Sequence, residues 1–152
     1  FEGAALMLAS AKAAAVSNTQ PSAHVIGADQ GLVLDDEPLH KVPNRDAARK
    51  QLLRLRGRTH ELHSAVALAI NGKVIWQKVD TARMTMRNFS NAWLEHYLDT
   101  AGSALTSSVG CYELEGAGVQ LFDAIDGSYF TILGLPLLPL LSELRRQGVI
   151  PS

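Results

Sequence analysis

The sequence predicts an α/β protein, because segments of helical and of strand-like character interleave along its 152 residues. Two further observations support this class. An Asn71-Gly72 dipeptide separates two long strand-like runs, and hydrophobic residues make up 47% of the chain, enough to bury a core as one domain over residues 1–152. We therefore expect a single α/β domain with a twisted mixed sheet flanked by helices.

The first segment is predicted to be a helix over Glu2 to Ser17, since it is rich in Ala and contains no proline. Gln20-Pro21-Ser22 ends it. Four of its residues recur at helical spacing and predict the buried face: Leu6, Ala9, Ala13 and Val16.

Two short extended segments are predicted after the first helix. His24 to Asp29 is mostly apolar and predicts a buried strand that places the Asp29 carboxylate at its C-terminal end, and Leu32 to Leu34 predicts a second strand. Asn44 then predicts the N-cap of a helix that runs to Leu55 and is stopped by Gly57.

A β-hairpin is the clearest local prediction. Leu62 to Ile70 is rich in β-forming residues, and Lys73 to Met86 alternates in polarity. Asn71-Gly72 between them is typical of a type I′ turn, because both residues tolerate a positive φ.

The last third of the chain predicts two helices and two strands. Ser90 favours a helix to about Ala101, and Pro136 favours the start of a last helix. Gly110 to Gly118 contains three glycines and predicts a loop at the sheet edge. Strands are predicted at Val119 to Phe122 and Tyr129 to Leu133.

Composition excludes several classes of protein. With Lys+Arg 14 against Asp+Glu 15, the chain has no general attraction for a nucleic-acid polymer. The longest apolar stretch, Ile132 to Leu141, contains two prolines and a glycine and is too short to span a membrane. Cys111 is the single cysteine, which excludes an internal disulfide and a Cys-rich zinc site. We expect a cytoplasmic protein.

Several polar residues are candidates for chemistry, and each has a plainer alternative. The Asp29 carboxylate could bind a divalent cation or orient water, or could simply be a turn residue. Lys12 and Lys41 could neutralise phosphate oxygens, or could be solvated surface lysines. Arg58 could form forked hydrogen bonds to phosphate, or could simply bind a carboxylate of the chain. For Glu115, binding of a metal or water competes with plain edge charge.

Read in order, these segments resemble the Maf septum-formation family of nucleotide pyrophosphatases, from about Leu8 to the C-terminus. Four blocks support the resemblance: Val-Ile-Gly-Ala-Asp29-Gln-x-Leu-Val-Leu-Asp35-x-Glu37-x-x-x-Lys41, Gly57-Arg58-Thr59-His60-Glu61, Gly110-x-Tyr112-x-x-Glu115-Gly116-x-Gly118, and Phe122-x-x-Ile125-x-Gly127-x-Tyr129-x-x-x-Leu133-Gly134-Leu135-Pro136. The resemblance implies an inosine-triphosphate-pyrophosphatase-like (Maf/Ham1) fold, with two lobes around a cleft.

The resemblance also implies an activity and a set of site residues. The activity is hydrolysis of a nucleoside triphosphate to the monophosphate and pyrophosphate, aided by Mg²⁺ or Mn²⁺. Asp29 matches the family's catalytic acidic residue, which would orient the attacking water or bind the metal. Glu115 is a weaker candidate, either for a second metal ligand or for a contact to the base. Lys12 and Lys41 match phosphate contacts, and Arg58 is a further candidate contact. The sequence leaves a homodimer open.

Gln30 bears on the choice of substrate. Together with Ser107-Ser108 and Glu115, it places the chain nearer to the branch that prefers 7-methyl-GTP than to the branch that hydrolyses dTTP and UTP, and UTP or CTP is the second choice.

The chain opens on Phe1 in mid-pattern, so we expect it to lack the family's N-terminal strand and Ser-x-x-Arg-Arg phosphate-binding loop. The alternative is therefore a non-catalytic nucleotide-binding or regulatory Maf-like protein.

Overall fold

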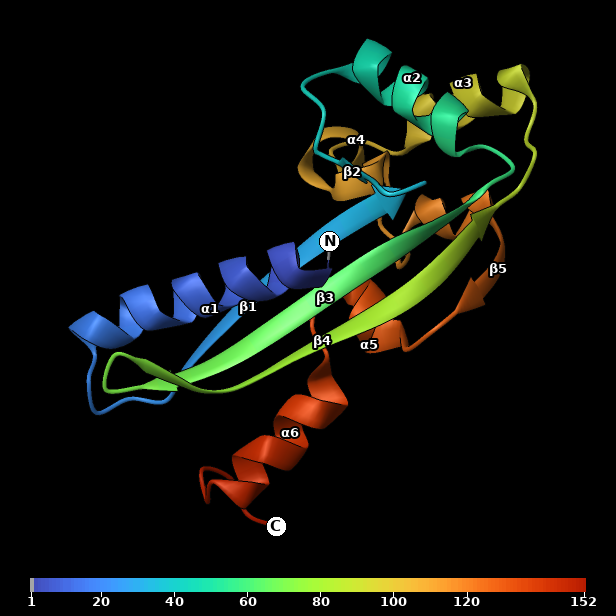
Figure 1. The fold of residues 1–152 in the computed structure, drawn as a ribbon. Coiled ribbons are helices and arrows are strands. Elements are labelled where there is room, and N and C mark those ends of the chain that lie inside the picture. The colour runs from blue at the N-terminus through green and yellow to red at the C-terminus, as the bar shows by residue number, and fades with distance from the viewer. Residues whose placement is uncertain (1) are drawn as a thin grey trace. The chain divides into compact units, whose positions relative to one another are not determined.

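The computed structural model describes residues 2–152 and shows helices and strands that interleave along the chain (Figure 1). The chain forms two compact units. The first unit comprises the chain up to Gly31, His63–Thr81 and Ser128–Ser152, and the second comprises Leu32–Leu62 and Ala82–Gly127.

A five-stranded sheet has the order β2-β1-β3-β4-β5. The strands are β1 (Val25–Leu34), β2 (Glu37–Leu39), β3 (Thr59–Ile70), β4 (Lys73–Met86) and β5 (Phe122–Asp126). The α/β class is confirmed. Where the sequence predicted a mixed sheet, the structure has an antiparallel one. The β1–β2 and β4–β5 pairs are antiparallel, and tight turns join β1 to β2 and β3 to β4.

The predicted hairpin turn is confirmed between β3 and β4. Asn71 has a φ of 53° and Gly72 a φ of 76°, as a type I′ turn requires. A similar pair of left-handed residues, Asp35 and Asp36 (φ 49° and 62°), turns the chain from β1 into β2.

The first unit is built in layers around β3. On one face, α1 (Glu2–Thr19) packs its small side chains against alanines of β3, and on the other face α6 (Leu137–Arg146) packs against Val66 and Leu68 (Figure 1). Successive strand residues point to opposite faces, so Ala65, Ala67 and Ala69 face α1, whereas Val66 and Leu68 face α6. The alanines of the α1 layer are Ala5, Ala9, Ala13, Ala65, Ala67 and Ala69.

Helix α1 lies very close to β1. A Cβ atom at Gly27 would lie 2.4 Å from the carbonyl oxygen of Ala9 and 2.7 Å from the amide nitrogen of Ala13, so only glycine fits. The predicted buried face of α1 is confirmed at Ala9 and Ala13. Val16 is 52% exposed instead, because the buried residues recur at every fourth position and the one after Ala13 is Ser17.

The second unit contains α2 (Arg45–Leu55), α3 (Asn91–Thr100) and the short α4 (Ala104–Ser107). Both predicted N-caps are confirmed: Asn44 Oδ1 accepts from the amide of Ala47 at 2.9 Å, and Ser90 Oγ accepts from the amide of Trp93 at 3.0 Å. Two short 3₁₀ turns, at Val109–Cys111 and Ala117–Leu121, lie in and around the predicted glycine-rich loop.

Three predicted strand positions are wrong. Val25–Leu34 is one continuous strand rather than two pieces. Residues Ala117–Leu121 form a 3₁₀ turn, so that β5 begins only at Phe122. Tyr129–Leu133 is a helix, α5, because Gly134 with a φ of 114° closes its last turn by donating to the carbonyls of Phe130 and Thr131. Within the described residues, no helix is both long and apolar enough to cross a membrane.

Candidate active site

Lys12 and Asp29 form an ion pair between α1 and β1 in the first unit. Lys12 Nζ lies 2.7 Å from Asp29 Oδ1 and donates a second hydrogen bond, of 3.2 Å, to the carbonyl oxygen of Ala28. The Lys12 side chain is 57% exposed, whereas that of Asp29 is 18% exposed. The pair therefore combines a sheltered carboxylate with a cation that solvent and ligands can reach.

The position of Asp29 corrects one prediction. Asp29 lies midway along the ten-residue strand β1 and not at a strand's C-terminal end. The strand continues through Gly31 to pair with β2 at Leu32, so the carboxylate projects from the face of the sheet toward α1.

Gln30 points to the opposite face of β1 from Asp29, as strand alternation requires. Its Nε2 donates to three acceptors: Ile132 O at 3.0 Å, Thr131 O at 3.3 Å and Ser64 Oγ at 3.3 Å. Ser64 Oγ in turn donates to Thr131 O at 2.5 Å. Because these three groups accept hydrogen bonds, the Nε2 end of the Gln30 carboxamide faces them and the Oε1 end faces away.

The other end of the Gln30 carboxamide is available to a ligand. Oε1 accepts no hydrogen bond from the part of the chain that the structure describes, and a Cβ at Gly134 would lie 3.6 Å from it. Because Gly134 lacks a side chain, Oε1 is left with space beside it. Gln30 can thus accept a hydrogen bond from a ligand, while its donor end is already engaged.

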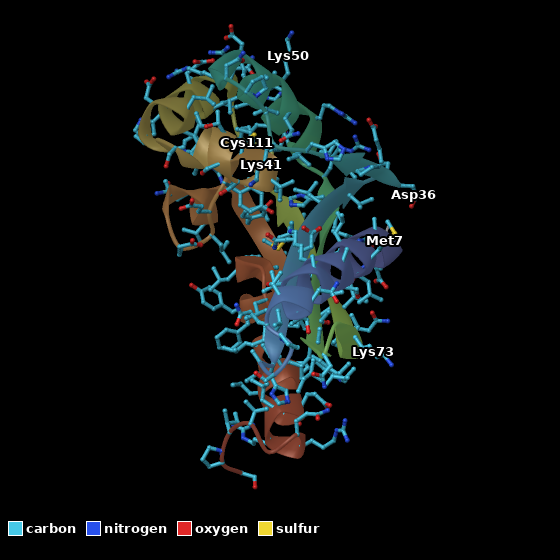
Figure 2. The ribbon with its side chains drawn as sticks, turned by 90° about the vertical axis from the view of Figure 1, so that its left-hand side faces the viewer. Met7, Asp36, Lys41, Lys50, Lys73 and Cys111 are labelled. Atoms are coloured by element: carbon cyan, nitrogen blue, oxygen red, sulfur yellow. The ribbon has the colours of Figure 1, made fainter. Side chains whose placement is uncertain are left out.

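Lys41 and Arg58 belong to the second unit and differ in their surroundings. Lys41 is exposed in the loop after β2 (Figure 2) and makes no hydrogen bond or ion pair with any described residue. Arg58 forms an ion pair with Asp35 of the β1–β2 turn. Lys41 is therefore ready to bind an anion, whereas Arg58 would have to exchange its partner.

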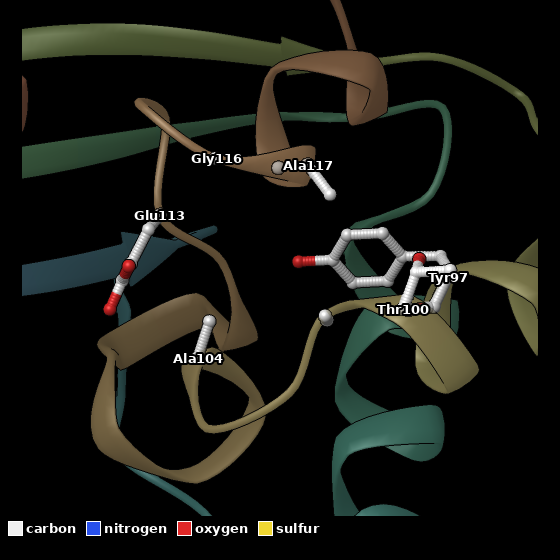
Figure 3. A pocket seen from close by; sticks show the side chains of 8 residues that line it. Tyr97, Thr100, Ala104, Glu113, Gly116 and Ala117 are labelled. Carbon is white, nitrogen blue, oxygen red and sulfur yellow. The ribbon is translucent and has the colours of Figure 1, made fainter.

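Glu115 is exposed in a turn of the glycine-rich loop and, within residues 2–152, makes no hydrogen bond or ion pair. A cavity of about 230 Å³ lies beside this loop (Figure 3), but Glu113 lines it and Glu115 does not. The sequence prediction named Glu115 in this segment, whereas the carboxylate that faces the cavity is that of Glu113, two residues earlier. The other lining residues are Tyr97, Thr100, Ala101, Ala104, Gly116, Ala117 and Gly118.

Two titratable residues of the second unit, His60 and Cys111, are buried and uncharged. His60 Nε2 lies 2.7 Å from the Tyr112 hydroxyl, and burial lowers the pKa of His60 to about 4, so the ring is neutral at pH 7. Burial raises the pKa of the Cys111 thiol to about 12, so this cysteine is no nucleophile. The Cys111 side chain is fully buried, as is common for a small apolar residue.

The described residues contain no group of three or more His, Cys, Asp or Glu side chains that could enclose a metal ion. Mg²⁺ in nucleotide enzymes often uses only one or two carboxylates, with phosphate oxygens and water as its other ligands. Asp29 fits that arrangement, because only its Oδ1 is engaged by a described residue and Oδ2 is left for another partner.

Comparison with known proteins places the chain in a family. The model of the Maf-like protein family matches residues 2–147. The 7-methyl-GTP pyrophosphatase of Brucella abortus is 52% identical over 149 residues, which are 98% of this chain and 75% of the relative. The nucleoside triphosphate pyrophosphatase of Bradyrhizobium diazoefficiens is 54% identical over 145 residues, 95% of this chain and 72% of the relative.

A third relative, the 7-methyl-GTP pyrophosphatase of Mesorhizobium japonicum, is 51% identical over 149 residues, 98% of this chain and 75% of the relative. The matches span both units, including Lys12 and Asp29 in the first and Lys41 in the second. The resemblance seen in the sequence blocks is thus confirmed, and the chain belongs to the Maf family.

Proposed function

We propose that this chain is a nucleotide pyrophosphatase that hydrolyses a nucleoside triphosphate to the monophosphate and pyrophosphate. 7-Methyl-GTP is the favoured substrate, and UTP or CTP is the second choice. The observation on which the proposal chiefly rests is the Lys12–Asp29 pair, in which a reachable cation is held 2.7 Å from a sheltered carboxylate. The names of the relatives in Brucella and Mesorhizobium support the choice of substrate.

Lys12 is proposed to stabilise the negative charge of the phosphates. Its ammonium group is held by Asp29 Oδ1 and the carbonyl oxygen of Ala28, so its position is set before the substrate binds. A charge that is already in place lowers the barrier more than one that must reorganise during the reaction. The exposed side of the ammonium group is free to face the leaving pyrophosphate.

Asp29 is proposed to orient the attacking water. Since Oδ1 accepts from Lys12, Oδ2 is the oxygen that would accept a hydrogen bond from water. As the water oxygen bonds to phosphorus and pyrophosphate departs, the water proton moves toward this carboxylate. Lys12 meanwhile keeps the charge of the carboxylate balanced.

A divalent cation such as Mg²⁺ or Mn²⁺ would offset charge on the phosphate oxygens when it binds together with the triphosphate. Asp29 would be its protein ligand. Oδ2 would bind the cation either directly, instead of the attacking water, or indirectly, through that water. Glu115 stays a predicted second ligand, supported by its exposure and its lack of other partners among residues 2–152.

Lys41 is proposed as a second phosphate contact, since its ammonium group is exposed and engaged by none of the described residues. Arg58 is a weaker contact in this proposal, because a phosphate would have to compete with Asp35 for its guanidinium group. Gln30 would accept a hydrogen bond from the substrate through Oε1.

The proposal concerns a free nucleotide, and we therefore place the activity in the cytoplasm. A nucleic-acid polymer is not the proposed partner, because the near balance of 14 basic and 15 acidic residues provides no general attraction for a polyanion.

The test is pyrophosphate release from 7-methyl-GTP, UTP, CTP, dTTP and GTP, each with Mg²⁺ or Mn²⁺. Lys12→Met should lower kcat/KM by about 100-fold or more, since it removes a positioned charge. Lys73→Met is the matched control, because Lys73 is an exposed lysine at the start of β4 in the same unit (Figure 2). Equal activity of the Lys12 variant and the control would refute the assigned site.

A further inference from the structure

We propose that Gln51 is a positioning residue for Lys41, and that the thiol of Cys111 orients Gln51. This inference rests on the proposed function only through the role of Lys41 as a phosphate contact. All three residues belong to the second unit, and Figure 2 labels Lys41 and Cys111. Neither Gln51 nor Cys111 has a part in the chemistry proposed above.

Gln51 holds the backbone from which Lys41 projects. It lies on α2, is 9% exposed, and its Nε2 donates a hydrogen bond of 3.1 Å to the carbonyl oxygen of His40. That carbonyl belongs to the peptide bond between His40 and Lys41. Because a peptide bond is planar, holding its oxygen also sets the direction of the Lys41 amide and limits where the Lys41 side chain starts.

Cys111 determines which way the Gln51 carboxamide faces. The thiol is fully buried, and its Sγ donates to Gln51 Oε1 across 3.1 Å. Since burial raises the pKa of Cys111 to about 12, the thiol keeps its proton at neutral pH and remains a donor. If the carboxamide turned over, Gln51 Oε1 would face the His40 carbonyl oxygen and its amide would face the thiol hydrogen, and both contacts would become repulsive.

The position of Cys111 is itself fixed by its neighbours. Its carbonyl oxygen accepts a 2.8 Å hydrogen bond from the Tyr97 hydroxyl, and its amide donates to the carbonyl of Ser108 at 3.2 Å. Its φ is 66°, a left-handed conformation that is unusual for a residue other than glycine. A chain of contacts thus runs from Tyr97 through Cys111 and Gln51 to the backbone of Lys41.

Anchoring matters for Lys41 because the side chain has no described partner of its own. An exposed lysine explores many rotamers, and only its backbone origin is constrained. Displacement of a catalytic contact by about 1 Å can cost up to about 100-fold in rate. Loss of one anchoring hydrogen bond to a loop should shift Lys41 less than that, so we expect about a 10-fold loss of kcat/KM.

The test is a double-mutant cycle of Gln51→Met and Lys41→Met, with kcat/KM measured for 7-methyl-GTP hydrolysis. Gln51→Met keeps the length of the side chain but removes its donor and acceptor. We expect it to lower kcat/KM by about 10-fold when Lys41 is present and to have no further effect when Lys41 is already methionine. A purely structural role would give the same loss in both backgrounds and would overturn the inference.

Variants at Cys111 test the inference even if Gln51→Met does not fold. Cys111→Ser keeps a donor for Gln51 Oε1, whereas Cys111→Ala removes it. We expect Cys111→Ala to lower kcat/KM severalfold, again only when Lys41 is present, and Cys111→Ser to stay near the parent protein. A loss in Cys111→Ala that persists unchanged in the Lys41→Met background, or no loss at all, would overturn the orienting role.

Failure of this inference and failure of the proposed function have different signatures. If Lys41→Met alone leaves kcat/KM unchanged, the phosphate role of Lys41 in the proposed function is wrong. If Lys41→Met lowers kcat/KM but the effects of Gln51→Met simply multiply with it, only the positioning role is wrong.

Discussion

Lys12 on α1 lies 2.7 Å from Asp29 in the middle of β1, and the lysine is the more exposed partner of this ion pair. The close approach of α1 to β1 at Gly27 brings the two side chains together. A surface ion pair of this kind contributes little to stability, typically about 0–1 kcal/mol. Effects of changing it should therefore appear in activity much more than in folding.

Asp29→Asn should abolish most of the activity while leaving the fold intact. The change keeps the size of the side chain but removes the charge that a cation or a water proton needs, so kcat/KM should fall by about 100-fold or more. Thermal unfolding and pyrophosphate release measure the two effects. Asp99→Asn is the control, because Asp99 is also ion-paired, with Arg45, but lies in the second unit. Near-normal turnover of the Asp29 variant would remove Asp29 from the catalytic site.

Gly27→Ala should strongly destabilise the protein, and Gly31→Ala should not. Both glycines lie in β1, but a Cβ at position 27 would meet the backbone of α1 at 2.4 Å, whereas one at position 31 would have no described heavy atom within 4 Å. Overpacking of this kind costs about 1–3 kcal/mol or more. Urea unfolding of the two variants measures the difference. Equal stabilities would show that α1 does not pack on β1 as described.

His60 should make the protein less stable in acid. Burial lowers its pKa from 6.5 to about 4, so between these values the unfolded chain binds a proton that the folded chain excludes. The free energy of unfolding is thus highest above pH 6.5 and falls as the pH drops toward 4, by up to about 3 kcal/mol for this one group.

The contribution of His60 can be isolated by comparing the parent protein with His60→Gln in urea unfolding between pH 4.5 and 7.5. Glutamine does not titrate and can still hydrogen-bond to the Tyr112 hydroxyl. The variant should lose part of the pH dependence. An identical slope in both proteins would show that His60 titrates alike in the folded and unfolded states.

The substrate preference should favour 7-methyl-GTP over dTTP, with UTP or CTP between them. Gln30 presents an acceptor, Oε1, while its donor end is bound to Ile132, Thr131 and Ser64. A hydrogen bond to one well-placed polar group is worth about 1–3 kcal/mol, or roughly 5- to 150-fold in selectivity. Measured kcat/KM ratios in the parent protein and in Gln30→Met provide the test. A clear preference for dTTP would contradict the subgroup assignment but not the pyrophosphatase activity.

Much of the fold was predictable because its signals are local. The two N-caps and the Asn71-Gly72 turn depend on neighbouring residues alone, and each is confirmed. Tyr129–Leu133 was not predictable in the same way. A five-residue apolar run is compatible with a strand or a helix, and the outcome here depends on the left-handed turn at Gly134.

Residues of the candidate site could also be predicted from local signals, but their contacts could not. Spacing and resemblance indicated Lys12 and Asp29, but their ion pair depends on the packing of α1 on β1. The contacts of Gln30 with Thr131 and Ile132 join segments about a hundred residues apart, and the contact of Cys111 with Gln51 joins segments 60 residues apart. No local pattern encodes such pairs, since they arise only when the tertiary structure forms.

The most direct test of the account is identification of the products formed from 7-methyl-GTP by ³¹P NMR in the presence of Mg²⁺. We predict 7-methyl-GMP and pyrophosphate in equal amounts, formed by the parent protein and nearly absent with Asp29→Asn or Lys12→Met. Formation of the diphosphate and inorganic phosphate, or equal turnover by the parent protein and both variants, would contradict the proposed pyrophosphatase activity at the Lys12–Asp29 site.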